Sequence, residues 1–231
     1  MIQLPKDEVK KPQPEPHNFF IWGATMSGKS YFASFFPHPL SLNTDGNAEQ
    51  GSVPSIQIRN IRGKDGKLTQ SVIKQLDEII TVLQTTPHTF KTILIDVIDD
   101  ICTMIEQAIC IDNDVQALSD IPYGKGFATF NGVLQQFVMD LKALPMNVIY
   151  ISRELIVTDD QTNTSEAVPS LKTKYYNVVN GNCDLVIHTQ KFGKDTYTRT
   201  VTDRRTKYKP ENINDARVRK LLETCTGMFD K

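Results

Sequence analysis

The chain has 231 residues and a formal net charge of −1, with 39% hydrophobic and 23% charged residues. These values are typical of a globular protein with a substantial core. They exclude a long disordered chain, a collagen-like repeat, a small disulfide-stapled scaffold and a uniformly basic nucleic-acid coat. The length predicts one domain over residues 18–231, preceded by a flexible, Pro-rich lead-in over residues 1–17.

The cysteines and histidines are scattered along the chain and form no CxxC pair, which argues against a zinc site. Cys102, Cys110 and Cys225 fall in apolar stretches, so we expect buried free thiols. No apolar run approaches the roughly 20 residues that span a membrane. The polar N-terminus does not have the pattern of a signal peptide. We therefore expect a reducing, cytoplasmic location and no membrane partner.

Short apolar runs alternate with helical spacing of apolar residues up to residue 151. Proline residues at 37, 87 and 145 mark the ends of helical patterns. In chain order, the predicted elements are strand 19–22, helix 29–36, strand 40–43, strand 56–58, helix 72–83, strand 92–95, helix 101–109, helix 127–141 and strand 148–151. Residues 112–126 are expected to form a polar loop.

The pattern changes after the last of these strands. Residues 157–166 are polar, and 184–188 and 196–201 predict a hairpin around a Gly-containing turn. A final helix is expected after Asn214, with Gly227 at its end. The fold class that follows is α/β: a mostly parallel sheet flanked by helices, with a C-terminal hairpin and helix over about 184–228.

The strongest motif is GATMSGKS, which fits GxxxxGK[ST] and lies between a predicted strand and a predicted helix. Its glycines allow backbone N–H groups to point inward, and the helix N-terminus adds a positive end. Lys29 would neutralise the β- and γ-phosphates, and Ser30 would ligate Mg²⁺. The alternative is a Gly-rich turn with a surface lysine. The motif predicts ATP and Mg²⁺ as cofactors, bound by Gly23, Ala24, Thr25, Met26, Ser27, Gly28, Lys29, Ser30 and Tyr31.

A phosphate-binding loop needs a carboxylate for the metal, and the end of a buried strand is the expected place. Asp96 directly follows the apolar strand 92–95 and is the candidate ligand beside Ser30. The alternative is that Asp96 caps the next helix. Asp99 and Asp100 are better interpreted as caps, with Asp99 also near the metal.

Hydrolysis also needs a group that activates water. Asp45 and Glu49 follow the strand 40–43 and are the candidates, although Asp45 also suits a turn. Ser152, at the tip of the strand 148–151, is a candidate sensor of the γ-phosphate. Its neighbours Arg153 and Glu154 could instead form a solvated ion pair.

Six segments in this order resemble phage-encoded RecA-like P-loop ATPases of the AAA group, which includes single-strand annealing recombination proteins. The resemblance covers roughly residues 17–215. The segments are GATMSGKS, LSLNTDGN, TILIDVIDD, IPYGKGFATFNGVLQQF, NVIYISRE and VVNGNCDLVIH.

The resemblance implies an ATPase of the host cytoplasm that acts on single-stranded DNA in phage recombination or replication. In the family the second strand is often followed by TEGG, so Asp45 takes the place of the glutamate. Arg153 replaces the histidine of a His-Glu pair. Family members hydrolyse ATP between subunits of a ring or filament, which implies that Arg204 or Arg205 acts in trans. The alternative there is a solvated basic turn. A single-strand binding protein is a further candidate partner.

The resemblance also implies DNA-contacting loops at about 113–126 and 155–180. The first contains Tyr123 and Lys125, and the second contains Lys172, Lys174, Tyr175 and Tyr176. Lysine suits phosphate and tyrosine suits stacking on bases. The alternative for Tyr175 and Tyr176 is packing on the core.

The near-neutral net charge is a sum of opposed regions. Residues 92–123 contain seven Asp or Glu and no Lys or Arg, whereas 187–231 contain eleven Lys or Arg and six Asp or Glu. This segregation suits a metal–nucleotide site and head-to-tail contacts between subunits.

Three functions compete at this stage. The first is an ATPase stimulated by DNA, with Lys29, Asp45, Asp96, Ser152 and Arg205 as catalytic candidates. The second is a nucleoside or nucleotide kinase, which would need an Arg-rich lid, and residues 92–123 offer no Arg for one. The third is a nucleotide-gated binding module with little turnover, which is favoured because Asp45 and Arg153 differ from the glutamate and histidine of the family pattern.

Overall fold

The computed structural model describes residues 6–9, 11–46, 51–159 and 163–229. Its centre is a mostly parallel sheet with the strand order β10-β9-β1-β7-β6-β2-β3, and β8 pairs with β7. A separate two-stranded ribbon is formed by β4 and β5. The strands are β1 (Asn18–Gly23), β2 (Pro39–Asn43), β3 (Ser55–Gln57), β4 (Ile61–Arg62), β5 (Leu68–Gln70), β6 (Thr92–Asp96), β7 (Asn147–Asp159), β8 (Thr164–Pro169), β9 (Leu185–Phe192) and β10 (Thr196–Arg204).

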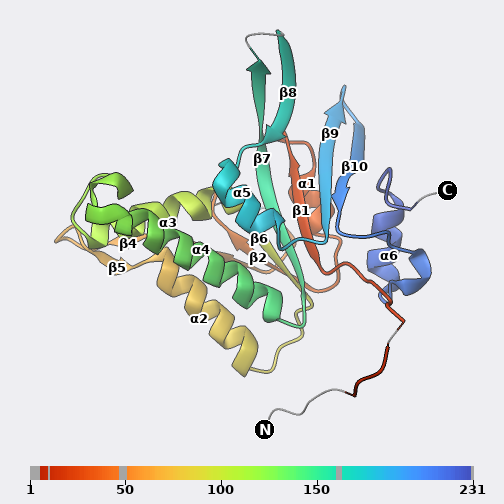
Figure 1. Cartoon of the computed structure of the whole chain (residues 1–231), viewed down its shortest axis with the longest axis horizontal. Helices are drawn as coiled ribbons and strands as arrows, with labels where there is room; N and C mark the ends of the chain where they lie inside the picture. Colours follow the sequence, from red (N-terminus) through yellow and green to blue (C-terminus); the bar gives the residue numbers. More distant parts are fainter. Residues whose placement is uncertain (1–5, 10, 47–50, 160–162, 230–231) are drawn as a thin grey trace.

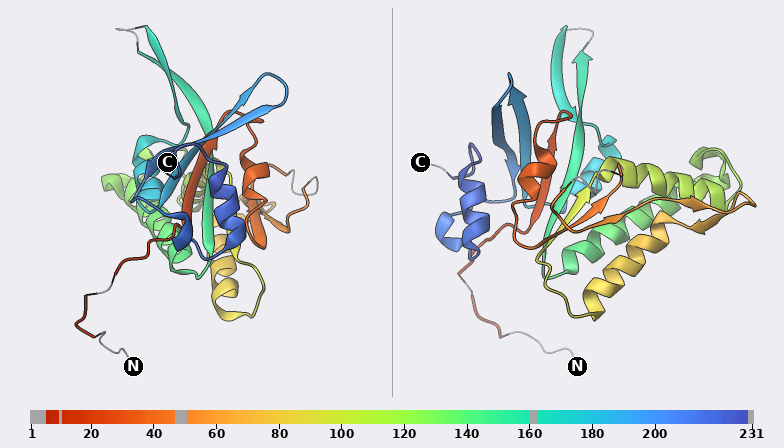
Figure 2. Two further views of the ribbon diagram at one scale, coloured as in Figure 1. Left: turned by 90° about the vertical axis from the view of Figure 1, so that its right-hand side faces the viewer. Right: turned by 180° about the vertical axis from the view of Figure 1, so that it is seen from behind.

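Helices cover both faces of the sheet, as Figures 1 and 2 show. The helices are α1 (Lys29–Ala33), α2 (Val72–Thr85), α3 (Ile98–Asp112), α4 (Lys125–Ala143), α5 (Thr173–Asn180) and α6 (Ala216–Glu223). One core packs α1 and α6 on the sheet, and the other packs α2 to α5 on the opposite face. The fold class predicted from the sequence is therefore confirmed.

Successive residues of β1 show why the central strands are continuously apolar. Phe19 and Ile21 belong to the core under α1 and α6, whereas Phe20 and Trp22 belong to the core under α2 to α5. Side chains alternate between the faces of a strand, so a strand that is covered on both faces needs an apolar residue at every position. All four cysteines are buried free thiols, as expected for three of them.

The strand predicted over 148–151 ends too early, and the polar stretch 157–166 contributes to two strands. Strand β7 continues to Asp159 and β8 returns beside it, so residues 154–159 and 164–169 form a second antiparallel ribbon. It projects beyond the sheet on the side from which the β9–β10 ribbon also extends (Figure 1). The sequence does not predict the outer part of β7 or β8, because polar and apolar residues do not alternate regularly there.

Two other local predictions are corrected. Val97, not Asp99 or Asp100, is the N-cap of α3, and the two aspartates lie in its first turn. The region 112–126 contains 3-10 turns at Leu118–Asp120 and Pro122–Gly124 before α4 begins at Lys125. No helix among the described residues is long and apolar enough to cross a membrane.

Tyr175 and Tyr176, proposed for base stacking, pack on the core. The Tyr175 ring lies 4.3 Å from that of Phe130, and its hydroxyl donates to Glu106 at 2.5 Å. Tyr176 packs edge-on against Phe20 with ring centroids 5.2 Å apart. The segment 173–180 is helical because these two rings anchor it to the sheet and to α4.

Candidate functional site

The phosphate-binding loop leaves β1 at Gly23 and leads directly into α1. Lys29 is only 8% exposed, and its Nζ donates to the carbonyl oxygens of Gly23 and Ala24 at 2.8 and 2.7 Å. An ammonium group has three donors, so one remains for a phosphate oxygen. The alternative of a surface lysine in a Gly-rich turn is thus excluded by burial. In contrast, Met26 and Tyr31 are 81% and 66% exposed.

Close contact with β9 explains the first glycine of the loop. A Cβ on Gly23 would lie 2.1 Å from the carbonyl oxygen of Thr189. The hydroxyl of Thr189 also lies 2.7 Å from Ser27 Oγ, a side chain that is 2% exposed. Gly28 has φ 86°, in the left-handed region that glycine adopts at least cost. Strand β9 therefore packs against the phosphate-binding loop through Thr189.

Ser30 and Asp96 meet beneath the loop, since the Ser30 side chain hydrogen-bonds the Asp96 carboxylate. The register of β6 places Asp96 opposite Asn43 of β2 and Ile151 of β7, at the edge where the parallel strands end. A hydroxyl and a carboxylate are donors that Mg²⁺ accepts, and Mg²⁺ commonly uses only one or two protein ligands plus phosphate oxygens. The pair therefore fits a magnesium ion.

The electrostatics of the loop and Asp96 reflect their burial. Burial lowers the pKa of Lys29, against the opposing influence of Asp96. Burial also raises the pKa of Asp96, opposed by the Ser30 hydrogen bond and reinforced by the nearby Asp45 carboxylate. Each charged form is disfavoured by desolvation, so a polyanion with a divalent cation would compensate both.

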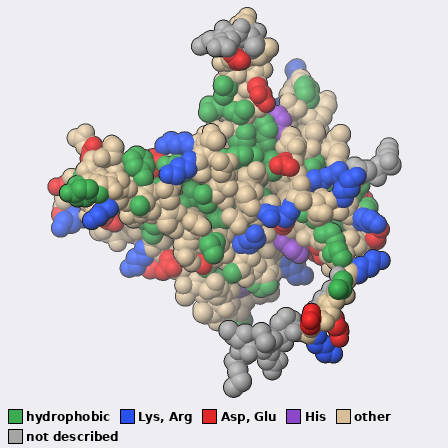
Figure 3. Space-filling view, in the orientation of Figure 1, with side chains coloured by type: hydrophobic (Ala, Val, Ile, Leu, Met, Phe, Trp, Pro, Cys, Tyr) green, Lys and Arg blue, Asp and Glu red, His purple; other side chains and the backbone are tan. Residues whose placement is uncertain are grey.

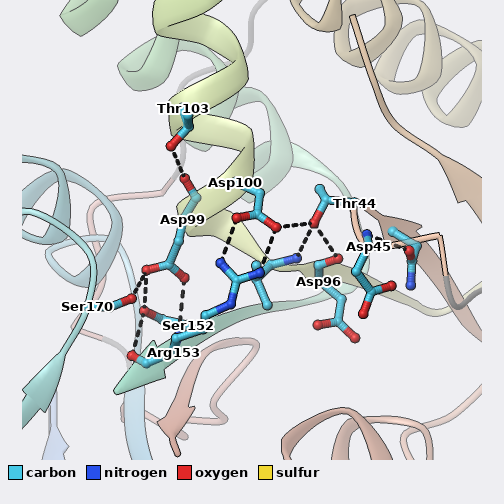
Figure 4. Close-up of polar contacts among 11 residues, drawn as sticks. Thr44, Asp45, Asp96, Asp99, Asp100, Thr103, Ser152, Arg153 and Ser170 are labelled. Atoms are coloured by element: carbon cyan, nitrogen blue, oxygen red, sulfur yellow. Dashed lines mark hydrogen bonds and ion pairs between the residues drawn. The ribbon is translucent and has the colours of Figure 1, made fainter. Parts of the chain in front are cut away.

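Asp45 lies in an Asx turn at the end of β2. The Asn43 side chain accepts hydrogen bonds from the backbone N–H groups of Asp45 and Gly46, at 3.0 and 3.1 Å. The carboxylates of Asp45 and Asp96 point the same way in Figure 4. The structure thus makes Asp45 part of a turn and also brings it to the site. Glu49, the other candidate, lies outside the described residues.

Arg153 joins β7 to α3 through a bidentate ion pair with Asp100. Its two terminal nitrogens lie 2.6 and 2.8 Å from the Asp100 oxygens (Figure 4). Thr44, beside Asp45, donates to the same carboxylate at 2.9 Å. The Arg153 hydrogen bond is the main reason that the pKa of Asp100 is lowered. Arg153 and Glu154 are therefore not paired with each other, contrary to that alternative.

Asp99 ties together the two arms of the β7–β8 ribbon at its base. It accepts hydrogen bonds from Ser152 Oγ at 3.0 Å and from the backbone N–H of Arg153 at 3.2 Å, both on β7. It also accepts from the hydroxyl of Ser170, the residue after β8. Ser152 is fully buried, and this hydroxyl points to Asp99. One side chain of α3 thus fixes the root of the ribbon.

Replacing Asp99 with asparagine is expected to loosen this root. The carboxamide keeps one acceptor oxygen and places its NH2 group against either the two serine hydroxyls or the Arg153 N–H, so the protein should lose about 1–3 kcal/mol of unfolding free energy. Urea denaturation measures the loss, and amide hydrogen exchange over 153–170 locates it. Asp140→Asn on the exposed face of α4 is the control. Unchanged exchange in the ribbon would contradict the role of Asp99.

A histidine that the sequence analysis left without a role completes the edge of the site. His188 Nε2 lies 2.7 Å from Glu154 Oε2. The His188 ring stacks on the ring of Trp22, the residue before Gly23, with ring centroids 3.7 Å apart. Both polar side chains are nearly buried. Glu154 stands where the family motif has its glutamate, and this match is the signal in the sequence that Glu154 belongs to the site. The partner from β9 could not be identified because it lies 34 residues further on.

Arg204 and Arg205 lie at the other end of the sheet from the loop. Arg204 pairs with Leu185 at the start of β9, whereas Trp22 pairs with His188 near the loop. Arg205 Nε lies 3.4 Å from Asp184, and its guanidinium donates to the carbonyl oxygens of Gly181 and Cys183. Neither arginine is thus near this chain's own phosphate-binding loop, and the role in trans remains a prediction.

A family model described as an AAA domain matches residues 15–220 of the chain. No curated protein matches it. Among solved structures, one titled as the crystal structure of the RadB recombinase is 14% identical, with 82% of each chain covered and a TM-score of 0.44. A likeness at this level carries no argument about activity.

Proposed function

Because the chain belongs to the AAA domain family, we propose that it is a RecA-like ATPase that binds ATP with Mg²⁺, hydrolyses it and acts on single-stranded DNA. One observation carries the nucleotide part of this proposal. Lys29, Ser30, Asp96 and Asp45 come from three strand ends and meet at one edge of the sheet. The order of the motifs, rather than any DNA contact, supports the finer role in phage recombination or replication of the annealing type.

The site residues divide the chemistry among them. Lys29 would balance charge on the β- and γ-phosphates, and the backbone of residues 23–30 would cradle them. Ser30 and Asp96 would hold Mg²⁺, which when bound neutralises charge on the phosphate oxygens. Asp45 would orient the attacking water and accept its proton. Arg153 would position Asp45 and the end of β7, since its partner Asp100 also accepts a hydrogen bond from Thr44, the residue before Asp45.

The DNA part of the proposal is supported by the end of the molecule where β4 and β5 lie. Tyr123 is 96% exposed and Phe127 is 45% exposed. Lys and Arg side chains lie beside hydrophobic and acidic ones there in Figure 3. Charge for phosphates and rings for stacking is the combination that single strands require. The exposed members are Arg62, Lys64, Lys67, Tyr123, Lys125 and Phe127.

The experiment compares ATP hydrolysis alone, with single-stranded DNA and with the same sequence as a duplex. We expect single-stranded DNA to raise phosphate release. Lys64→Glu with Lys67→Glu should reduce this stimulation and its salt-sensitive DNA binding, while basal hydrolysis is unchanged. Lys209→Glu with Lys220→Glu, which makes the same charge change beside α6, is the matched control.

Two outcomes would favour the other functions. Transfer of the phosphoryl group to an added nucleoside or nucleotide would indicate a kinase. Tight ATP binding without phosphate release, in the presence or absence of DNA, would indicate a nucleotide-gated binding module. A candidate single-strand binding protein would be tested only after DNA stimulation is established.

A further inference from the structure

The two ribbons that project from the sheet differ in charge. Among the described residues 155–159 and 163–171 of the β7–β8 ribbon, the charged side chains are those of Asp159 and Glu166. The tip of the β9–β10 ribbon contains Lys191 and Lys194 against Asp195. Three acidic side chains of α3, in contrast, are bound by Arg153, Ser152 and Lys172. The β7–β8 ribbon is therefore one exposed acidic surface, together with Asp112, Asp114 and Asp120 of the segment 92–123.

A groove of about 500 Å³ runs along one face of the β7–β8 ribbon down to α5. Its apolar lining includes Val157, Val168, Leu171 and Tyr176, and Glu166 lines it as an exposed acidic residue. Leu155, Ile156 and Val157 are each more than half exposed. An exposed apolar stretch beside acidic residues, on a ribbon with few supporting contacts, is typical of an interaction site.

The β9–β10 ribbon carries the complementary chemistry. Phe192 and Tyr197 are 53% and 43% exposed, and Lys191 Nζ lies 5.3 Å from the centre of the Tyr197 ring. The tip thus presents aromatic rings and ammonium groups together. The two ribbons of one chain point in different directions in the left-hand view of Figure 2.

We propose that the tip of the β9–β10 ribbon of one copy docks in the β7–β8 groove of a second copy. Phe192 would enter the apolar groove, and Lys191 and Lys194 would pair with Glu166 and its acidic neighbours. Because donor and acceptor are different surfaces, the contact is heterologous and can repeat from copy to copy. This inference concerns assembly and does not depend on ATP hydrolysis or DNA binding.

The experiment is a charge swap read by sedimentation equilibrium over a range of protein concentrations. The parent protein should self-associate, and more weakly as salt is added. Lys191→Glu with Lys194→Glu, or Glu166→Lys alone, should weaken association at least about tenfold, because like charges then face each other. Combining the three changes should recover much of it. Phe192→Ser should weaken association by a factor that is the same at low and high salt. Lys209→Glu with Lys220→Glu should have no effect.

Circular dichroism melting shows whether each variant is folded. Because the substituted side chains are exposed on the ribbons, a variant that loses assembly alone should keep the parent melting temperature. A protein that sediments as a monomer at every concentration overturns the proposal. So does association that survives all the reversals, or a triple variant that fails to recover. Loss of retention on single-stranded DNA with unchanged mass would assign these ribbons to DNA and overturn docking between copies.

Discussion

Replacing Lys29 with alanine is expected to reduce ATP hydrolysis by about 10²–10³-fold or more, because the cation that faces the phosphates is removed. Its ammonium is buried inside the loop, held by the carbonyl oxygens of Gly23 and Ala24. Burial lowers the pKa of Lys29, so keeping the ammonium charged reduces the stability of the folded protein. The variant should therefore lose nucleotide binding without losing its structure.

Steady-state phosphate release and binding of a fluorescent ATP analogue measure the two effects. Thermal melting without nucleotide shows that the fold survives. Lys74→Ala is the matched control, since Lys74 lies on the exposed surface of α2, where it pairs with Glu78. If Lys29→Ala hydrolysed ATP at the parent rate, the loop would not be the nucleotide site.

Replacing Asp96 with asparagine is expected to have two opposite effects. Hydrolysis should fall by about 10²-fold or more, since the carboxylate that fits Mg²⁺ is lost. Stability without nucleotide should rise at neutral pH. Burial raises the pKa of Asp96, so the folded protein holds the proton more tightly than the unfolded chain. The ionised carboxylate therefore costs stability above the folded pKa, and asparagine removes that cost.

The sign of this effect can be followed with pH. The gain in melting temperature of Asp96→Asn should be largest at neutral pH. It should shrink as the pH falls from the raised pKa of Asp96 toward the ordinary aspartate value, because the parent carboxyl becomes protonated. Asp99→Asn, which removes a hydrogen-bonded carboxylate, should instead lower the melting temperature. A lower melting temperature for Asp96→Asn at neutral pH would show that this carboxylate stabilises the fold.

How far the site could be predicted depended on where its parts lie in the sequence. The loop was found because Gly23 to Ser30 are consecutive, and Asp96 because a buried strand ends beside it. Asp45 was reached in the same way, through the end of β2. The roles of Asp99, Asp100 and Arg153 were missed because these residues pair across more than 50 positions. A local pattern cannot show which carboxylate faces which partner.

The sequence by itself determined the alternating α/β pattern, the strands buried on both faces and the phosphate-binding loop, because each depends on spacing within about ten residues. Only the tertiary structure decided which polar groups meet. Asp99 became the anchor of a ribbon rather than a helix cap, and Glu154 met His188 rather than Arg153. The physical reason is that the strand order brings β9 and α3 to the end of β7, and this order is set by packing of the whole sheet.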